Sequence, residues 1–174
     1  NAAHFDIRVW GLPPVSAPAG CVTVIRAGSF TPLEAKQGAD QKIFYIHVPA
    51  AWVAFLACFL VAVASGVYLW LRDPRLDRFA ESSAEVGVVF TTVVLITGPL
   101  WAKPIWGTYW AWWDVRLVST LFLWFIYASY IVLRGAIDSP EMRARYSAVL
   151  GILGALLIPF IHLSVYLFAT MHPM

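Results

Sequence analysis

Aromatic side chains are concentrated in one short stretch, residues 101–113, which holds five of the chain's nine Trp and one Tyr. Flat apolar rings suit a large planar ligand, and the neighbouring cations Lys103 and Arg116 suit a ligand that also carries anionic groups. A membrane-interface belt is the alternative, because Trp and Tyr collect at the headgroup level of membrane proteins. A belt needs only about one or two aromatics per helix end, so the density favours a binding platform. Its candidate residues are Trp101, Trp106, Tyr109, Trp110, Trp112 and Trp113.

Two histidines are candidate metal ligands. His47 lies just before the first long apolar segment, and His172 lies just after the last one. Imidazole is a common axial ligand of haem iron, and two imidazoles can fill both axial positions. A lone histidine near a membrane interface is more often a polar anchor. Ligation therefore becomes the better interpretation only if both histidines lie on the same side of the membrane as the aromatic stretch.

Two further polar residues allow more than one interpretation. His162 lies inside the last apolar segment, where an ionisable residue is a functional candidate by default. We favour the simpler prediction that its imidazole hydrogen-bonds a neighbouring helix near the backbone freed by Pro159. Asp114, close to Arg116, is either part of the ligand site or half of a structural ion pair that fixes the loop.

The composition excludes several classes of protein. A hydrophobic fraction of 60% rules out an ordinary soluble domain and indicates a multi-pass membrane protein. The same hydrophobic fraction makes the lipid bilayer the expected surrounding. The net charge of +2 is too small to indicate a nucleic-acid partner. Cys21 and Cys58 form no CxxC or CxxCH pattern, which excludes a covalent c-type haem site, and Cys58 is expected to be a packing residue.

Four apolar segments predict an all-α protein with about four transmembrane helices. Residues 1–42 are expected to be a polar, loop-like leader without a span, and residues 43–174 a membrane domain. Pro49 is expected in the first turn of the first helix, and Pro104 and Gly107 are expected to prevent a continuous helix through the aromatic stretch. The last span is expected to be interrupted by Pro159. The predicted spans are 48–71, 86–102, 117–133 and 146–171.

The distribution of basic residues predicts the orientation in the membrane. The first and third connections carry six arginines, whereas the aromatic connection, 101–117, carries two basic residues. The positive-inside rule therefore places the arginine connections in the cytoplasm and the aromatic stretch outside, which means the periplasm of a bacterium. By alternation, His47 and His172 lie on that same outer face. The six arginines are Arg72, Arg75, Arg78, Arg134, Arg143 and Arg145.

The order of residues in the aromatic stretch resembles a known signature. The runs 106–110 (WGTYW) and 113–117 (WDVRL) resemble the tryptophan-rich "WWD" segment of haem-handling proteins in cytochrome c maturation, and the WDxRL form is similar to the CcmC type. The resemblance covers roughly residues 28–173 in order. Tyr109 replaces a Trp of the family pattern, one extra residue precedes Asp114, and Val118 stands where Thr is usual. The family has six transmembrane helices, so four here imply a chain truncated at both ends.

The resemblance implies a haem carrier rather than an enzyme. His47 and His172 match the family's two periplasmic histidines, the axial ligands of a non-covalent, transient haem b. The six aromatic residues, Asp114 and Arg116 would form the rest of the site. In such a family the protein sits in the bacterial inner membrane and delivers haem to the periplasmic chaperone CcmE, working with CcmA, CcmB and CcmD.

Two other functions remain open. One is a bis-histidine electron-transfer subunit, but such proteins place both haem ligands within their spans, and His162 alone is predicted to be intramembrane here. The other is a structural subunit or an inactive fragment of the haem-handling family. It would bind no haem and would tolerate substitution of His47 and His172.

Overall fold

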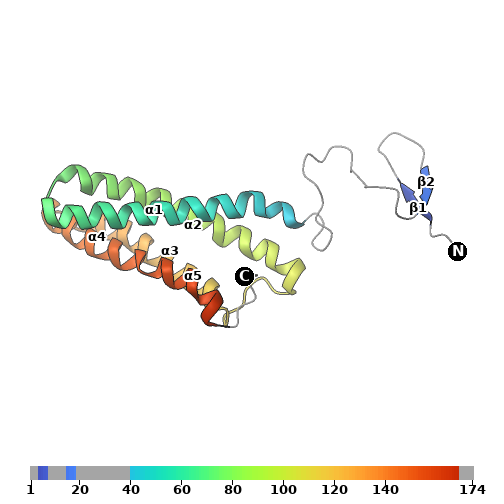
Figure 1. Cartoon of the computed structure of the whole chain (residues 1–174). Coiled ribbons are helices and arrows are strands. Elements are labelled where there is room, and N and C mark those ends of the chain that lie inside the picture. Colours follow the sequence, from blue (N-terminus) through green and yellow to red (C-terminus); the bar gives the residue numbers. More distant parts are fainter. Residues whose placement is uncertain (1–3, 8–14, 19–39, 169–174) are drawn as a thin grey trace. The chain divides into compact units, whose positions relative to one another are not determined.

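The computed structural model describes residues 4–7, 15–18 and 40–168 (Figure 1). The chain divides into two compact units, residues 1–42 and 43–174. In the first unit, β1 (His4–Ile7) pairs antiparallel with β2 (Val15–Pro18). The expected loop-like leader therefore contains a two-stranded ladder. Of the residues that predict a break in regular structure, Pro18 is the last residue of β2 and pairs with His4.

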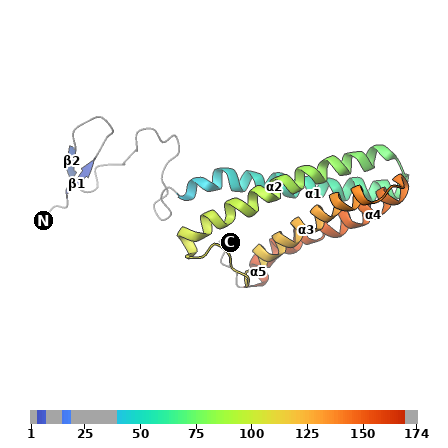
Figure 2. The same ribbon diagram turned by 180° about the vertical axis from the view of Figure 1, so that it is seen from behind.

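The second unit is a bundle of helices. Among the described residues, four helical stretches are long and apolar enough to cross a membrane, the first of which begins with the short 3-10 helix η1 (Asp40–Ile43). This confirms the predicted all-α fold with four spans. Figures 1 and 2 show α1 beside α2, and α3 beside the α4–α5 stretch. The helices are α1 (Phe44–Leu71), α2 (Pro74–Trp106), α3 (Val115–Ala136), α4 (Pro140–Ala155) and α5 (Leu157–Leu167).

The helices extend beyond the apolar segments that predicted them. α2 begins at Pro74 rather than at residue 86, because Asp73 caps it by accepting a hydrogen bond of 2.9 Å from the Arg75 N–H. The segment that follows the cap also contains several strong helix formers, namely Arg, Leu, Ala and Glu. The arginine connections consequently shrink to residues 72–73 and 137–139. Hydropathy marks where the bilayer lies, whereas caps and turns mark where a helix ends.

Pro49 and Pro104 both lie inside helices that continue through them. α1 begins at Phe44, so His47 lies in its first turn and Pro49 lies inside the helix, not in the first turn as predicted. α2 also continues through Pro104, and that part of the prediction was wrong. Gly107 ends α2 instead: it has a φ of 78°, and its N–H donates to the Lys103 carbonyl oxygen at 3.0 Å. A proline in the last turn removes one hydrogen bond but leaves the rest of the helix intact.

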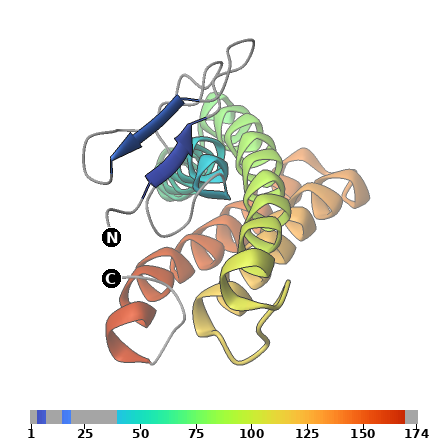
Figure 3. The ribbon, with the colours of Figure 1, turned by 90° about the vertical axis from the view of Figure 1, so that its right-hand side faces the viewer.

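Pro159 does interrupt its span, as predicted. It has no N–H to donate to the carbonyl of Ala155, and α4 ends at that residue. The chain resumes as α5 from Leu157. Figure 3 shows the end of the bundle that carries α5 and the connection from α2 to α3.

The core is built from small and aromatic side chains. Cys58 and Val61 of α1 are fully buried, which agrees with a packing role for Cys58. The Tyr127 hydroxyl of α3 is shared between the carbonyl oxygens of Gly151 on α4 (2.9 Å) and Cys58 (3.2 Å). A Cβ atom on Gly151 would lie 2.7 Å from Val61 Cγ1, so α4 approaches α1 where a glycine permits it. These contacts hold α1, α3 and α4 together.

An ion cluster ties α3 to α2 at the end opposite the aromatic stretch. Arg134 is 6% exposed, and its guanidinium donates to both carboxylate oxygens of Asp77, at 2.6 and 2.9 Å. A third hydrogen bond of 2.8 Å reaches Glu81. The two carboxylates thus bond both terminal nitrogens of the guanidinium, whereas its buried Nε–H has no hydrogen-bond partner among the described residues.

Candidate functional site

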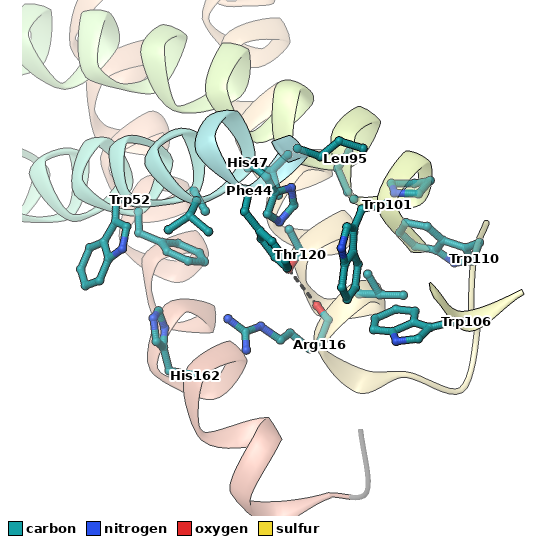
Figure 4. A pocket seen from close by; sticks show the side chains of 18 residues that line it. Phe44, His47, Trp52, Leu95, Trp101, Trp106, Trp110, Arg116, Thr120 and His162 are labelled. Atoms are coloured by element: carbon teal, nitrogen blue, oxygen red, sulfur yellow. Dashed lines mark hydrogen bonds between the residues drawn. The ribbon is translucent and has the colours of Figure 1, made fainter. Parts of the chain in front are cut away.

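A pocket of about 400 Å³ lies at the aromatic end of the bundle (Figure 4). Its walls come from α1, α2, α3, α5 and the connection 107–114, so it forms only when these elements pack together. Most of its surface is apolar and aromatic, with a small number of polar groups, as is usual for a small-molecule site. The polar and aromatic side chains that line it include His47, Trp101, Trp106, Trp110, Arg116 and His162.

The pocket separates the predicted aromatic platform into two groups. Trp101, Trp106 and Trp110, here called the inner tryptophans, line it. Trp101 is only 7% exposed; its ring centroid lies 5.0 Å from that of Phe44 on α1 and 5.1 Å from that of Trp106. These edge-on contacts fix the orientation of the inner rings.

The remaining aromatics of the stretch, here called the outer aromatics, face away from the pocket lining. Tyr109, Trp112 and Trp113 are 57%, 71% and 70% exposed. The Nζ atom of Lys103 lies 5.2 Å from the Tyr109 ring centroid and donates to the Gly107 carbonyl oxygen at 3.1 Å. Lys103, one of two cations considered for an anionic ligand, is thus placed with the outer aromatics, and Arg116 is the cation that lines the pocket.

Asp114 is fully buried and caps α3. Its carboxylate accepts hydrogen bonds from the backbone N–H groups of Arg116 (3.0 Å) and Leu117 (3.1 Å). It is outside the pocket lining. The structure therefore gives Asp114 a positioning role: it starts α3 at Val115 and so sets Arg116 in the first turn.

Arg116 projects into the pocket. Figure 4 shows its side chain extending past Trp101 toward His162. Within the described part of the chain, no carboxylate oxygen lies within ion-pair distance of its guanidinium group. A half-buried guanidinium against aromatic walls favours an anionic group on whatever the pocket holds.

His47 is held in one tautomer. Its Nδ1 lies 2.8 Å from the Thr97 hydroxyl oxygen, and that hydroxyl donates its one hydrogen to the Val93 carbonyl oxygen, also at 2.8 Å. Nδ1 must therefore be the donor to Thr97, which leaves the lone pair of the neutral ring on Nε2. Gly98 packs against the ring, since a Cβ atom there would lie 3.4 Å from His47 Cε1.

Thr97 and Gly98 were not predicted from the sequence. They are small or polar residues in an apolar span, which is a weak signal, and Thr97 is separated from His47 by 50 residues. Their contacts with His47 become apparent only when α1 packs on α2. His172, the predicted second ligand, lies outside the described residues.

His162 differs from its prediction. Its Nδ1 donates to the Ile158 carbonyl oxygen of its own helix at 3.1 Å, not to a neighbouring helix. The carbonyl freed by Pro159 belongs to Ala155, seven residues before His162, whereas the usual i−4 geometry brings this ring to the Ile158 carbonyl. The His162 ring packs on Phe55 of α1 with a centroid separation of 4.9 Å and lines the pocket.

Comparison with known families agrees with this arrangement. The model of the family described as heme exporter protein C, CcmC, matches residues 7–174. The chain belongs to the heme exporter protein C family. The match starts well before residue 28, so the resemblance to CcmC proteins extends further toward the N-terminus than the sequence motifs indicated.

Curated relatives support the same membership. Heme exporter protein C of Bradyrhizobium diazoefficiens is 41% identical over 145 residues, covering 83% of this chain and 54% of the relative. The Escherichia coli K12 protein of the same name is 34% identical over 173 residues, covering 97% of this chain and 69% of the relative. A putative cytochrome c biosynthesis ccmC-like mitochondrial protein of Marchantia polymorpha is 38% identical, with coverages of 81% and 59%. The chain thus spans between about half and two thirds of these CcmC-type relatives.

Proposed function

We propose that this chain binds haem b non-covalently and transiently and passes it on during cytochrome c biogenesis. The observation that carries the proposal is one pocket that joins His47, in a tautomer able to ligate iron, to the inner tryptophans and Arg116. The names of the relatives, heme exporter protein C, support the same cargo.

Each part of the pocket matches a part of haem. The unprotonated Nε2 of His47 suits an axial position, and its hydrogen-bonded Nδ1 is the usual support of a metal-ligating histidine. The inner tryptophans provide apolar walls for the macrocycle. Arg116 suits a propionate, and the buried Nε1–H of Trp110, which has no hydrogen-bond partner among the described residues, could donate to a carboxylate oxygen.

The described residues suit iron inside a macrocycle better than a bare metal ion. A bare ion needs several protein ligands, and no cluster of three or more His, Cys, Asp or Glu side chains occurs in the searched, described residues. Iron in a porphyrin needs only axial ligands, one or two imidazoles. We propose His172 as the second of them, on the resemblance to CcmC proteins.

The proposed setting is the bacterial inner membrane, with the aromatic end facing the periplasm, as the distribution of arginines indicates. The outer aromatics would then be at the presenting surface, where exposed Trp and Tyr suit contact with a partner protein. The proposed recipient is the chaperone CcmE, and the proposed companions are CcmA, CcmB and CcmD.

A haem titration of the purified chain in lipid nanodiscs tests the proposal. We expect a low-spin absorption spectrum for the parent chain and a weakened, altered spectrum for His47→Ala. Trp70→Ala is the matched control, because Trp70 is 85% exposed at the other end of α1, far from the pocket lining. A parent chain that takes up no haem, or a His47→Ala spectrum identical to that of the parent, would contradict the proposal.

A further inference from the structure

We propose that His162 is an iron ligand of a loading position, reached from the bilayer, through which haem passes before it is held at the final site. This inference rests on the proposed function and adds a second position and a direction of entry to it. The polypeptide from residue 40 to residue 168 contains two histidines, His47 and His162, and both line the same pocket.

The tautomer of His162 is suited to ligation. A carbonyl oxygen can only accept a hydrogen bond, so the contact of 3.1 Å between His162 Nδ1 and the Ile158 oxygen requires a protonated Nδ1. The lone pair of the neutral ring is then on Nε2. His47 and His162 therefore have the same tautomer, each with Nδ1 held by the protein, which is the usual arrangement of a metal-ligating imidazole.

His162 is an exposed residue within a predicted membrane span. It lies in the helical stretch Pro140–Ser164, which is long and apolar enough to cross a membrane, yet its side chain is exposed rather than packed in the core. An ionisable side chain in such a place is costly and calls for a function.

The wall beside His162 suits an apolar macrocycle entering sideways. Trp52 on α1 is 70% exposed and lines the pocket together with Phe55, whose ring packs on His162. Haem has a large apolar face and partitions into lipid, so entry between α1 and α5 avoids transfer of that face through water. The aromatic wall continues from Trp52 and Phe55 to the inner tryptophans.

Arg116 connects the two positions. Figure 4 shows its side chain between Trp101 and His162. A propionate held by its guanidinium could stay in place while the iron moves from His162 toward the final ligands. The step is a ligand exchange: the bond from iron to His162 Nε2 breaks, a bond to a final histidine nitrogen forms, and the oxidation state of the iron does not change.

A loading experiment separates entry from final binding. The chain in nanodiscs receives haem either from haem-loaded vesicles or from an aqueous haem–albumin complex, and the low-spin absorption is followed by stopped flow. His162→Phe keeps an aromatic ring against Phe55 but has no ligand nitrogen. We expect it to slow loading from vesicles at least about tenfold, equivalent to about 1.4 kcal/mol of lost stabilisation. Loading from albumin, which does not start from the bilayer, should be slowed much less than loading from vesicles. Leu163→Phe, at an exposed neighbouring position, is the control.

A trapping experiment gives a direct spectroscopic test. In a chain with His47→Ala and His172→Ala, haem supplied from vesicles should stop at the loading position with a five-coordinate, imidazole-ligated spectrum. Adding His162→Phe should abolish that spectrum. If the parent binds haem through His47 but His162→Phe changes neither the loading rate nor the trapped spectrum, this inference is wrong and the proposed function stands. If the parent takes up no haem from either source, both fail.

Discussion

Arg116 and Arg134 lie in the first and last turns of α3 and have opposite surroundings. They are eighteen residues apart, about 27 Å along a helix, which is close to the thickness of the hydrocarbon layer. The Arg134 guanidinium is buried and bonded to two carboxylates, Asp77 and Glu81. The Arg116 guanidinium lies against aromatic rings with no carboxylate within ion-pair distance among the described residues.

This difference distinguishes the end of the bundle that stabilises the fold from the end that carries the candidate site. At the Arg134 end, the connections 72–73 and 137–139 are short, and the ion cluster of Arg134 with Asp77 and Glu81 holds α3 against α2. At the Arg116 end, a longer connection carries the outer aromatics, and the Arg116 guanidinium lines the pocket with no carboxylate oxygen within ion-pair distance among the described residues. Charge satisfied within the protein contributes to the fold, and charge left available in a half-buried pocket favours an anionic ligand.

The largest effect is expected from breaking the scaffold end. Arg134→Met leaves the 13%-exposed carboxylate of Asp77 without its main partner. Loss of one partner from a buried ion pair typically destabilises a protein by about 3–5 kcal/mol. We expect a loss of this size in the free energy of unfolding, measured by denaturant titration in mild detergent.

Arg78→Met is the control for this prediction. Arg78 is exposed on the same helix as Asp77, so its substitution should change the free energy of unfolding by less than about 0.5 kcal/mol. Equal losses for Arg78→Met and Arg134→Met would show that the Arg134 cluster has no special structural role.

A smaller effect, on binding rather than folding, is expected at Arg116. Arg116→Leu removes the proposed propionate partner, and a hydrogen bond to a charged group contributes about 1.5–3 kcal/mol. We therefore expect haem affinity to fall by roughly 10- to 150-fold with little change in the unfolding curve. Arg116→Lys should recover part of the affinity but not the bidentate contact. Loss of stability without loss of affinity would make Arg116 a second scaffold arginine.

We expect the hydrogen bond that supports His47 to contribute less to haem affinity than Arg116 does. Thr97→Val keeps the shape of the side chain but removes the acceptor of the Nδ1–H hydrogen bond. Loss of such a supporting contact commonly lowers metal affinity by about 10-fold. We expect a fall of that order in haem affinity and a shifted absorption maximum. Thr91→Val is the matched control, because Thr91 makes the same bond to its own helix, to the Gly87 carbonyl oxygen, outside the pocket. An equal loss of haem affinity for both substitutions would show that Thr97 does not specifically support His47.

The fold was largely predictable because a membrane span has a simple sequence signal. Four long apolar segments gave four helices, and Pro159 gave the break in the last one. The ends of the helices were not predictable from hydropathy. The cap at Asp73 starts α2 in a charged segment, and the glycine at 107, not the proline at 104, ends it. Capping and backbone conformation decide these ends, and neither follows from how apolar a residue is.

The candidate site was predictable in its residue types but not in its arrangement. The aromatic stretch, His47 and Arg116 could be selected from the sequence because such side chains together suit a planar, anionic ligand. The end of α2 and the path of the connection after it determine which Trp side chains line the pocket. Sequence periodicity predicts neither of these. The contacts of His47 with Thr97 and of His162 with Phe55 join different helices, so only tertiary packing shows them.

The smallest effect on haem affinity is expected for the outer aromatics, which can be compared with the inner tryptophans at the same end of the bundle. Trp112 is 71% exposed and outside the pocket lining, whereas Trp106 lines it. Trp112→Leu should change the equilibrium affinity for haem by less than about twofold, as expected for an exposed residue without a buried contact to the ligand. Trp106→Leu should lower the affinity severalfold, because it removes part of an aromatic wall. Parallel haem titrations of the two variants decide between a site confined to the pocket and one that includes the whole stretch. Equal losses would mean that the outer aromatics fold over the haem, and the proposed role of Trp112 at a protein-contacting surface would then be wrong.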